Sequence, residues 1–240
     1  MLERIRNSAA AMTAIVRRQE ITANNLANVN TAGYRKDRLF EELLSDATGD
    51  NGILTSSRQL TTWTDQTHGN YEFTGRPLDV TIGGPGYFVV QDEASGRSYY
   101  TRAGHFSQDI QGQLVDSSGR TVTGQSGPIT IPPHADSVRI TQTGAVMAGS
   151  QEVGRIRVVD FESTAELRRV DGASFDADGA TPTDVDEPAL KAGYVEQSNV
   201  NALSEMASMV QDSRLFESQQ RALRTLDQTL ERAIRDLGQY

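Results

Sequence analysis

The sequence predicts an α+β protein with a mainly β central domain, sandwich- or barrel-like, flanked by an N-terminal and a C-terminal helix. Three observations support this prediction. Apolar residues recur at helical three- and four-residue steps near both ends of the chain, whereas the middle shows short alternating runs. Turn residues separate those runs at intervals of about 8–12 residues, which is typical of an all-β sandwich or barrel.

The first helix is expected over residues 2–26, where a heptad stripe continues for more than three repeats. An Asn-rich turn follows, and Gly33 is expected to adopt a positive φ or to admit a close backbone approach, because the chain must be redirected there. The stripe can pack on the protein's own domain or form a seam for other helices. Its members are Leu2, Ile5, Ala9, Met12, Val16, Gln19, Ala23 and Leu26.

The last helix is expected from about Ala202 to Leu237, a length that favours a coiled coil. Three of its seam positions are polar, and such residues can fix helix register. We therefore expect the two terminal helices to pair antiparallel as a coiled-coil-like assembly domain. The C-terminal seam consists of Ala202, Met206, Met209, Ser213, Phe216, Gln220, Leu223, Asp227, Leu230, Ile234 and Leu237.

Three parts are expected along the chain. Residues 1–34 and 195–240 form the terminal helical assembly domain, residues 35–75 form an extended linker or β-arm, and residues 76–194 form a β-rich outer domain. The arm is expected to begin with a short helical stretch from Arg35 to Leu44 and to continue as extended arms or a long β-hairpin. Its only tryptophan, Trp63, is expected to be a packing anchor.

Strands in the central domain are predicted from apolar alternation between turns. The Gly83–Gly86 stretch is predicted to be a β-turn and not a phosphate loop, because no helix follows it. Asp171–Pro188 is expected to be a solvated acidic loop, since it lacks the ligand order of an EF-hand. The predicted strands are Leu78–Ile82, Tyr87–Val90, Tyr99–Arg102, Gln113–Val115, Ile129–Ile131, Ser137–Thr141 and Gly154–Phe161.

Composition excludes several classes of function. The 240 residues carry 32 acidic and 23 basic side chains, a formal net charge of -9, and no basic stripe of the kind that binds nucleic acid. There is no cysteine for a disulfide or a thiol nucleophile. The sequence contains no run of about 18 apolar residues, so no transmembrane helix is predicted. The short apolar run Ser8–Val16 is followed by Arg17 and Arg18, so we expect no cleaved signal peptide.

No catalytic, metal-binding or cofactor-binding residues are predicted, and no small-molecule substrate is expected. His68, His105 and His134 lie in separate turns and are interpreted as lone surface histidines. Neither a HExxH metal motif nor a GxSxG nucleophile elbow is present. The sequence does not exclude a catalytic pair of carboxylates of the glycosidase type, because two such residues come together in space and not along the sequence.

Two terminal motifs carry a resemblance to a known family. Residues 23–34 read ANNLANVNTAGY and residues 193–201 read GYVEQSNVN, while PLDV at 77–80 and YTRAGHF at 100–106 lie between them. Together they resemble the motifs of bacterial flagellar axial proteins, the rod and hook subunits. The motif and turn residues are Asn24, Asn25, Asn28, Gly33, Tyr34, Asn199 and Asn201.

The resemblance implies a structural subunit of the flagellar basal-body rod, not an enzyme, that self-assembles through its terminal helices. The rod is the periplasm-spanning drive shaft that transmits torque and encloses the export channel. Implied partners are copies of the chain, other axial rod proteins and the flagellar export apparatus, which exports the chain without a cleaved signal. The expected assembly interface consists of Leu2, Ile5, Met12, Val16, Leu26, Met206, Met209, Phe216, Leu223, Leu230, Ile234 and Leu237.

Within that family the chain is most similar to the proximal-rod type. The similarity lies in the segment GPITIPP at 127–133 and in Met206, Met209 and RLFE at 214–217. The distal-rod type comes second, and a hook-type subunit is a further alternative. A secreted cell-wall-acting enzyme and an adhesin with helical oligomerisation ends are the alternatives outside the family.

Overall fold

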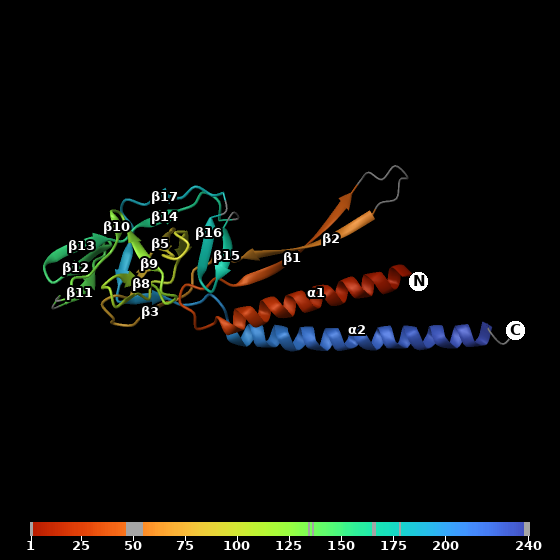
Figure 1. Ribbon diagram of the computed structural model, residues 1–240. Coiled ribbons are helices and arrows are strands. Elements are labelled where there is room, and N and C mark those ends of the chain that lie inside the picture. Colours follow the sequence, from red (N-terminus) through yellow and green to blue (C-terminus); the bar gives the residue numbers. More distant parts are fainter. Residues whose placement is uncertain are drawn as a thin grey trace. The chain divides into compact units, whose positions relative to one another are not determined.

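The protein is α+β, mostly β with one helix at each end, as the sequence predicts (Figure 1). It divides into two compact units. Unit 1 comprises Met1–Ala27, Asp37–Asp65 and Asn201–Tyr240, and unit 2 comprises Asn28–Lys36 and Gln66–Val200. The computed structural model describes residues 2–46, 55–133, 135, 137–164, 167–177 and 179–237.

Two antiparallel helices dominate unit 1. Helices α1 (Leu2–Ala27) and α2 (Ala202–Leu237) lie side by side, and their boundaries agree with the prediction to within one residue (Figure 1). Helix α2 begins at a cap, where Asn201 Oδ1 accepts a hydrogen bond from the Ser204 N–H at 3.0 Å. Neither helix is long and apolar enough, over its described residues, to cross a membrane.

An ion pair between Arg18 and Asp212 joins the two helices. Arg18 Nε donates to both carboxylate oxygens of Asp212 at 2.8 Å, and the Asp212 side chain is buried. On α2 the half-buried Met209, Phe216 and Leu223 follow the same heptad stripe as Asp212. Met206, predicted on this seam, instead lies on an exposed face of α2 and is 51% exposed.

The buried side of α1 differs from the predicted stripe by about one position. Ile15, Thr22 and Asn25 are buried, whereas Val16 is 40% exposed and Ala23 is exposed. The reason is that α1 packs against strand β1 as well as α2, which widens and rotates its buried arc. Met12, Gln19 and Leu26 lie half-buried at the edge of that arc. Six further seam side chains lie outside the described part of the structure: Leu2, Ile5, Asp227, Leu230, Ile234 and Leu237.

A long antiparallel hairpin, β1 (Asp37–Asp46) and β2 (Thr55–Thr64), completes unit 1. The predicted hairpin is therefore confirmed, but the helical stretch predicted from Arg35 to Leu44 is wrong. Leucines at helical spacing suggested a helix there, and the ten-pair ladder with β2 overrides that local preference. Trp63 is not a buried anchor: it is 47% exposed, and the Arg38 guanidinium lies 5.8 Å from its ring centroid.

The start of β1 is held by a side chain of α1. Asn25 Nδ2 donates to the Asp37 carbonyl and Asn25 Oδ1 accepts from the Asp37 N–H, both at 2.9 Å. The amide of Asn25 thus pairs with the backbone as a neighbouring strand would. Thr64, opposite Asp37 in the ladder, donates its hydroxyl to the Asp37 carboxylate at 2.7 Å.

Unit 2 is built from short antiparallel strands. The largest sheet has the order β15-β16-β6-β5-β9-β8-β7, with β10 on β9, β14 on β5 and β17 on β14; β11-β12-β13, β18-β4 and β19-β3 form smaller sheets. The strands are β3 (Tyr71–Phe73), β4 (Val80–Ile82), β5 (Tyr87–Gln91), β6 (Ser98–Thr101), β7 (Ser107–Gln108), β8 (Leu114–Val115), β9 (Thr121–Gly124), β10 (Gly127–Pro128), β11 (Val138–Ile140), β12 (Ala145–Ala148), β13 (Gln151–Arg155), β14 (Val158–Asp160), β15 (Leu167–Asp171), β16 (Ser174–Ala177), β17 (Thr183–Asp184), β18 (Leu190–Ala192) and β19 (Tyr194–Glu196).

Three predictions for this region are wrong. The single strand predicted at Gly154–Phe161 is interrupted, and its residues form the end of β13 and the whole of β14, which belong to different sheets. The segment Ile129–Ile131 is not a strand: its two isoleucines are buried in the core, but only Thr130 forms an isolated bridge. The acidic stretch after residue 170 is not one solvated loop, since it contributes the end of β15 and the whole of β16 to the main sheet. Aspartates suggested a loop, whereas Phe175 between them is fully buried.

The central strand β5 has a core on each of its faces. Phe88 and Val90 point into one cluster of buried apolar residues, and Tyr87 and Val89 point into a second. This alternation follows from the two-residue period of a strand. Because both faces are covered, the four residues are all buried despite alternating in direction.

We predict that Asp212→Ala destabilises unit 1 by about 1 kcal/mol, because Arg18 loses a charged partner that is shielded from water on one side. Thermal unfolding followed by circular dichroism of the helices measures the loss. Glu20→Ala is the control, since Glu20 pairs with Arg17 in an exposed ion pair and its removal changes stability by less than about 1 kcal/mol. Equal melting of the two variants contradicts a stabilising contact at Asp212.

Candidate functional site: the joint between the terminal segments

Within unit 2, the segment that follows α1 lies against the segment that precedes α2. The Gly33 N–H donates to the Glu196 carbonyl at 2.7 Å, and the Asn199 N–H donates to the Tyr34 carbonyl at 3.3 Å. Asn199 Oδ1 also accepts from the Lys36 N–H at 2.7 Å. We call residues 28–36 and 194–200, together with the side chains they bury, the joint.

Gly33 has both features predicted for it. Its φ is +69°, and a Cβ built on it lies 2.4 Å from the Ala103 nitrogen and 2.5 Å from the Arg102 carbonyl carbon. Only glycine fits a left-handed turn in such close contact with another backbone. The next residue, Tyr34, is fully buried, and the Arg169 guanidinium lies 4.5 Å from its ring centroid.

A buried ionic cluster lies at the centre of the joint. Arg35 Nη1 is 2.6 Å from Glu196 Oε1, and both side chains are 1% exposed. Arg102 Nη1 is 3.2 Å from Glu196 Oε2 and is buried as well. The Gly69 N–H donates to Glu196 Oε1 at 3.0 Å, so one carboxylate binds two guanidiniums and a backbone amide. Removing a partner from such a pair leaves an uncompensated buried charge.

His68 closes the cluster on its more exposed side. Its Nδ1 lies 2.9 Å from Arg102 Nη1 and 3.2 Å from Arg35 Nη2. Guanidinium groups only donate, so Nδ1 must be the unprotonated acceptor of the ring. Burial, and after it the charge of Arg102, lowers the pKa of His68 below its ordinary value. Burial likewise lowers the pKa of Arg35, an effect that Glu196 opposes.

A second polar cluster centres on Asp79 of the PLDV motif, which is fully buried. His105 Nδ1 lies 3.1 Å from Asp79 Oδ1, and Arg76 Nη1 lies 2.9 Å from His105 Nε2. The Thr74 hydroxyl donates to Asp79 Oδ2 at 2.6 Å. The interpretation of His68 and His105 as lone surface residues is therefore wrong, because each ring faces a buried carboxylate. His134 lies outside the described residues.

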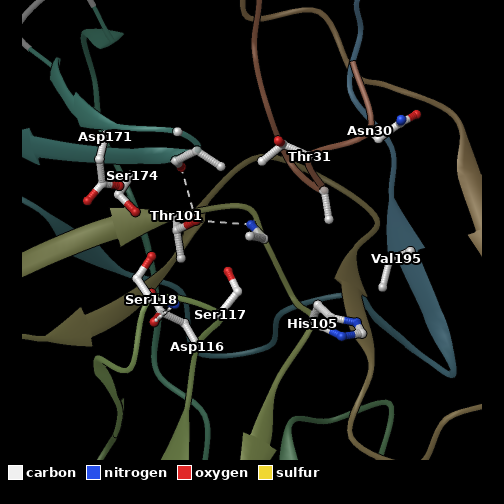
Figure 2. A pocket seen from close by; sticks show the side chains of 14 residues that line it. Asn30, Thr31, Thr101, His105, Asp116, Ser117, Ser118, Asp171, Ser174 and Val195 are labelled. Atoms are coloured by element: carbon white, nitrogen blue, oxygen red, sulfur yellow. Dashed lines mark hydrogen bonds between the residues drawn. The ribbon is translucent and has the colours of Figure 1, made fainter. Parts of the chain in front are cut away.

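A polar pocket of about 550 Å³ adjoins the joint (Figure 2). Two of its polar side chains have partners within the fold: the Thr101 hydroxyl donates to the Ala173 carbonyl, and Asp116 Oδ1 accepts from two backbone N–H groups. Burial raises the pKa of Asp116, while the nearby Asp171 forms an ion pair with Arg120. Over the described residues, no group of three His, Asp or Glu side chains could hold a metal ion.

The other motif residues hold turns and helix ends. Asn28 Oδ1 accepts from the Thr31 hydroxyl at 3.1 Å, Asn25 anchors β1, and Asn201 caps α2. Asn24 is exposed on α1. Sequence reasoning missed the charged members of the joint: Arg35, His68, Arg102 and Glu196. Three of them stand next to or inside the motifs, but a charged residue in a sequence is normally expected at the surface.

This arrangement defines a class of protein before it defines a family. In the described part of the chain, buried charged residues hold two terminal segments together. These segments continue into the two helices. Its pocket holds side chains that are engaged in turns and ion pairs and are not arranged as a nucleophile with its base. The described contacts are therefore those of a structural connection between two ends of the chain.

Comparison with known proteins identifies the family. Residues 5–35 match the model of the flagella basal body rod protein, residues 81–148 the flagellar hook protein FlgE/F/G D1 domain, and residues 191–236 the flagellar basal body rod FlgEFG protein C-terminal. The chain belongs to the flagellar basal-body rod protein family. The members of this family are structural proteins and not enzymes, so the alternative of a wall-acting enzyme is removed.

Relatives match along almost the whole chain. Flagellar basal-body rod protein FlgG of Caulobacter vibrioides is 31% identical, over 96% of this chain and 97% of its own length. Flagellar basal-body rod protein FlgF of Mesorhizobium japonicum is 31% identical over 95% of each chain. The FlgF protein of Escherichia coli is 32% identical, over 95% of this chain and 96% of its own length.

We predict that Gly33→Ala destabilises unit 2 strongly, because the new Cβ overlaps the backbone at Ala103 in addition to the cost of a positive φ. Gly119→Ala is the matched control: Gly119 has a φ of +80° with no atom within 4 Å of the added Cβ. The control is expected to lose about 1–2 kcal/mol from the φ alone. Urea unfolding gives both values, and equal losses exclude a role for the close approach.

We also predict that Glu196→Gln lowers the stability of unit 2 by about 3–5 kcal/mol, because two buried guanidiniums lose their counter-charge. Glu72→Gln removes an equal charge from the neighbouring strand β3, where Glu72 accepts an exposed hydrogen bond from Gln197. That control is expected to change stability by less than about 1 kcal/mol. Chemical denaturation of both variants measures the difference. A Glu196→Gln chain as stable as the control shows that the cluster contributes nothing to folding.

Proposed function

We propose that this chain is a subunit of the proximal rod of the flagellar basal body. In this proposal it assembles with copies of itself and with other axial proteins through its terminal helices, after passage through the flagellar export apparatus without a cleaved signal. The resulting tube transmits torque and encloses the export channel. A helical tube forms when subunits repeat a heterologous contact that does not close into a ring.

The observation that carries the proposal is an apolar stripe on α2 that has no partner within the described chain. Leu203 is 78% exposed, and Met206 and Val210 are each more than half exposed. Their spacing of three and four residues places all three on one face of the helix. At about 100° per residue, Leu203 lies opposite Asp212, but Met206 lies only about 80° from Phe216. The stripe therefore borders the seam with α1 and extends away from it, and its exposed fractions show that α1 does not cover it.

Two apolar faces on one helix suit a subunit in a multi-helix wall. We propose that Met209, Phe216 and Leu223 form a coiled-coil-like seam with α1 inside the subunit. The second face then packs against helices of neighbouring subunits. Complete burial of each of these three apolar side chains contributes about 1.5–3 kcal/mol to the free energy of association. The remaining predicted positions, Val16 and Leu26 among them, stay part of the proposed interface.

A distal-rod subunit is the second candidate. The observation that favours it is that relatives named FlgG match this chain as closely as relatives named FlgF, at 31% against 31–32% identity. The proximal assignment is tested in two mutant strains of a flagellated bacterium, one that lacks its proximal-rod subunit and one that lacks its distal-rod subunit. The chain is expressed in each strain separately. Restored swimming in the strain without the proximal subunit is expected, and restoration only in the strain without the distal subunit assigns the chain to the distal rod.

The assembly role is tested by the double variant Leu203→Asp and Met206→Asp. We predict that it abolishes incorporation into the rod, because two charges enter an interface that excludes water. The melting temperature of the isolated chain is expected to be unchanged, since both positions are exposed there. Acidic side chains are also favourable in the first turns of a helix. Swimming and the subunit content of purified basal bodies are the measurements.

Ser204→Asp with Ser208→Asp is the matched control, because it adds the same charge at exposed positions of the same helix outside the stripe. The control is expected to swim. Normal incorporation of the Leu203 and Met206 variant means that the stripe faces solvent in the assembled rod, and the proposal is then wrong.

A further inference from the structure

The ionic cluster of the joint contains one group, the His68 imidazole, whose ordinary pKa lies near neutral pH. Arg35, Arg102 and Glu196 are almost completely buried, but the His68 side chain is 47% exposed and can exchange a proton with water. The His68 ring therefore connects a buried ionic site with the solvent.

The geometry leaves only one place for a second proton on this ring. A neutral histidine whose Nδ1 accepts hydrogen bonds carries its proton on Nε2. Acid must consequently protonate Nδ1, the atom that lies 2.9 Å from Arg102 Nη1 and 3.2 Å from Arg35 Nη2. Protonation removes the shared acceptor and places a third cation against two guanidiniums.

The surrounding charges do not compensate for that cation. Three charged groups lie close to Nδ1: Arg35 after α1, Arg102 after β6 and Glu196 in β19. Glu196 Oε1 lies 3.5 Å from Nδ1 but already binds Arg35 and the Gly69 N–H. Tyr87, 5.5 Å below the Arg102 guanidinium, stays neutral because burial raises its pKa. Two positive charges already face one negative charge, and protonation makes them three.

We propose that His68 and the Arg35–Glu196–Arg102 cluster form a pH-sensitive lock on the two terminal segments. With neutral His68 the lock is closed, and residues 28–36 are fixed against residues 194–200. When Nδ1 is protonated, repulsion inside the cluster loosens the backbone hydrogen bonds from Gly33 to Glu196 and from Asn199 to Tyr34. The segments that lead into α1 and α2 thereby gain freedom while the core of unit 2 remains folded.

The direction of the pH effect follows from proton linkage. The unfolded chain binds the His68 proton at the ordinary pKa of about 6.5, and the folded chain binds it more weakly. Stability supplied by the closed lock is therefore present above about pH 6.5 and is lost as the pH falls. The effect is opposite to that of a histidine stabilised by a carboxylate alone.

Hydrogen exchange of the full-length chain, read by mass spectrometry and corrected for intrinsic exchange, tests the lock between about pH 7.5 and about pH 5, on either side of the ordinary histidine pKa. For the natural chain, protection of peptides 28–36 and 194–200 is expected to fall severalfold, whereas protection of β5 stays constant. His68→Gln retains an acceptor oxygen for the two arginines but cannot titrate, so its protection is expected not to change with pH.

His105→Gln is the matched control, because His105 is also half-exposed and faces a buried carboxylate, that of Asp79. It is expected to lose protection with acid as the natural chain does. The proposal is overturned if His68→Gln shows the same acid loss as the natural chain, if His105→Gln abolishes that loss, or if the natural chain keeps its protection throughout. Each result is independent of rod assembly, because the isolated chain is measured.

Discussion

The pairing of Glu196 with Arg35 and Arg102 is the constraint on which unit 2 depends. Charges buried this completely are tolerated only when each has its partner, so the three residues must arrive together. Their positions are fixed by backbone contacts on both sides, including the close approach of Gly33 to Ala103. The same contacts set where the chain leaves unit 2 on its way into α1 and α2. A single polar cluster thus determines both the completion of the β domain and the exits of the two helices.

Polar groups take a comparable role in unit 1. Asn25 pairs with the backbone of Asp37, and both carboxylate oxygens of the buried Asp212 accept from Arg18 Nε. Apolar burial alone leaves a helix free to rotate or slide, whereas a directional contact accepts a single register. The protein therefore combines modest apolar surfaces with a few directional anchors, as expected for a subunit that reserves part of its apolar surface for neighbours.

The two terminal helices were predictable because their heptad repeats are local, and α2 begins and ends where the pattern does. The strand at Asp37–Asp46 was not predictable, because its leucines have helical spacing and only pairing with β2 decides its conformation. Gly33 could be singled out, since its turn chemistry is a property of one residue. The cluster around Glu196 could not, because its members come from four distant parts of the sequence and no spacing rule connects them. The prediction that Trp63 is a packing anchor was wrong for a related reason. Which face of a hairpin is covered depends on the rest of the fold.

The contact between Lys36 and Asn199 spans 163 positions of the sequence. The entropy cost of closing such a long loop must be offset by contacts that form only when both ends are present. During synthesis the partner of Arg35 is among the last residues of the unit to leave the ribosome. Until then Arg35 and Arg102 remain hydrated cations on an open β framework. Unit 2 consequently stays unfinished, and therefore pliable, until its last residues have been made.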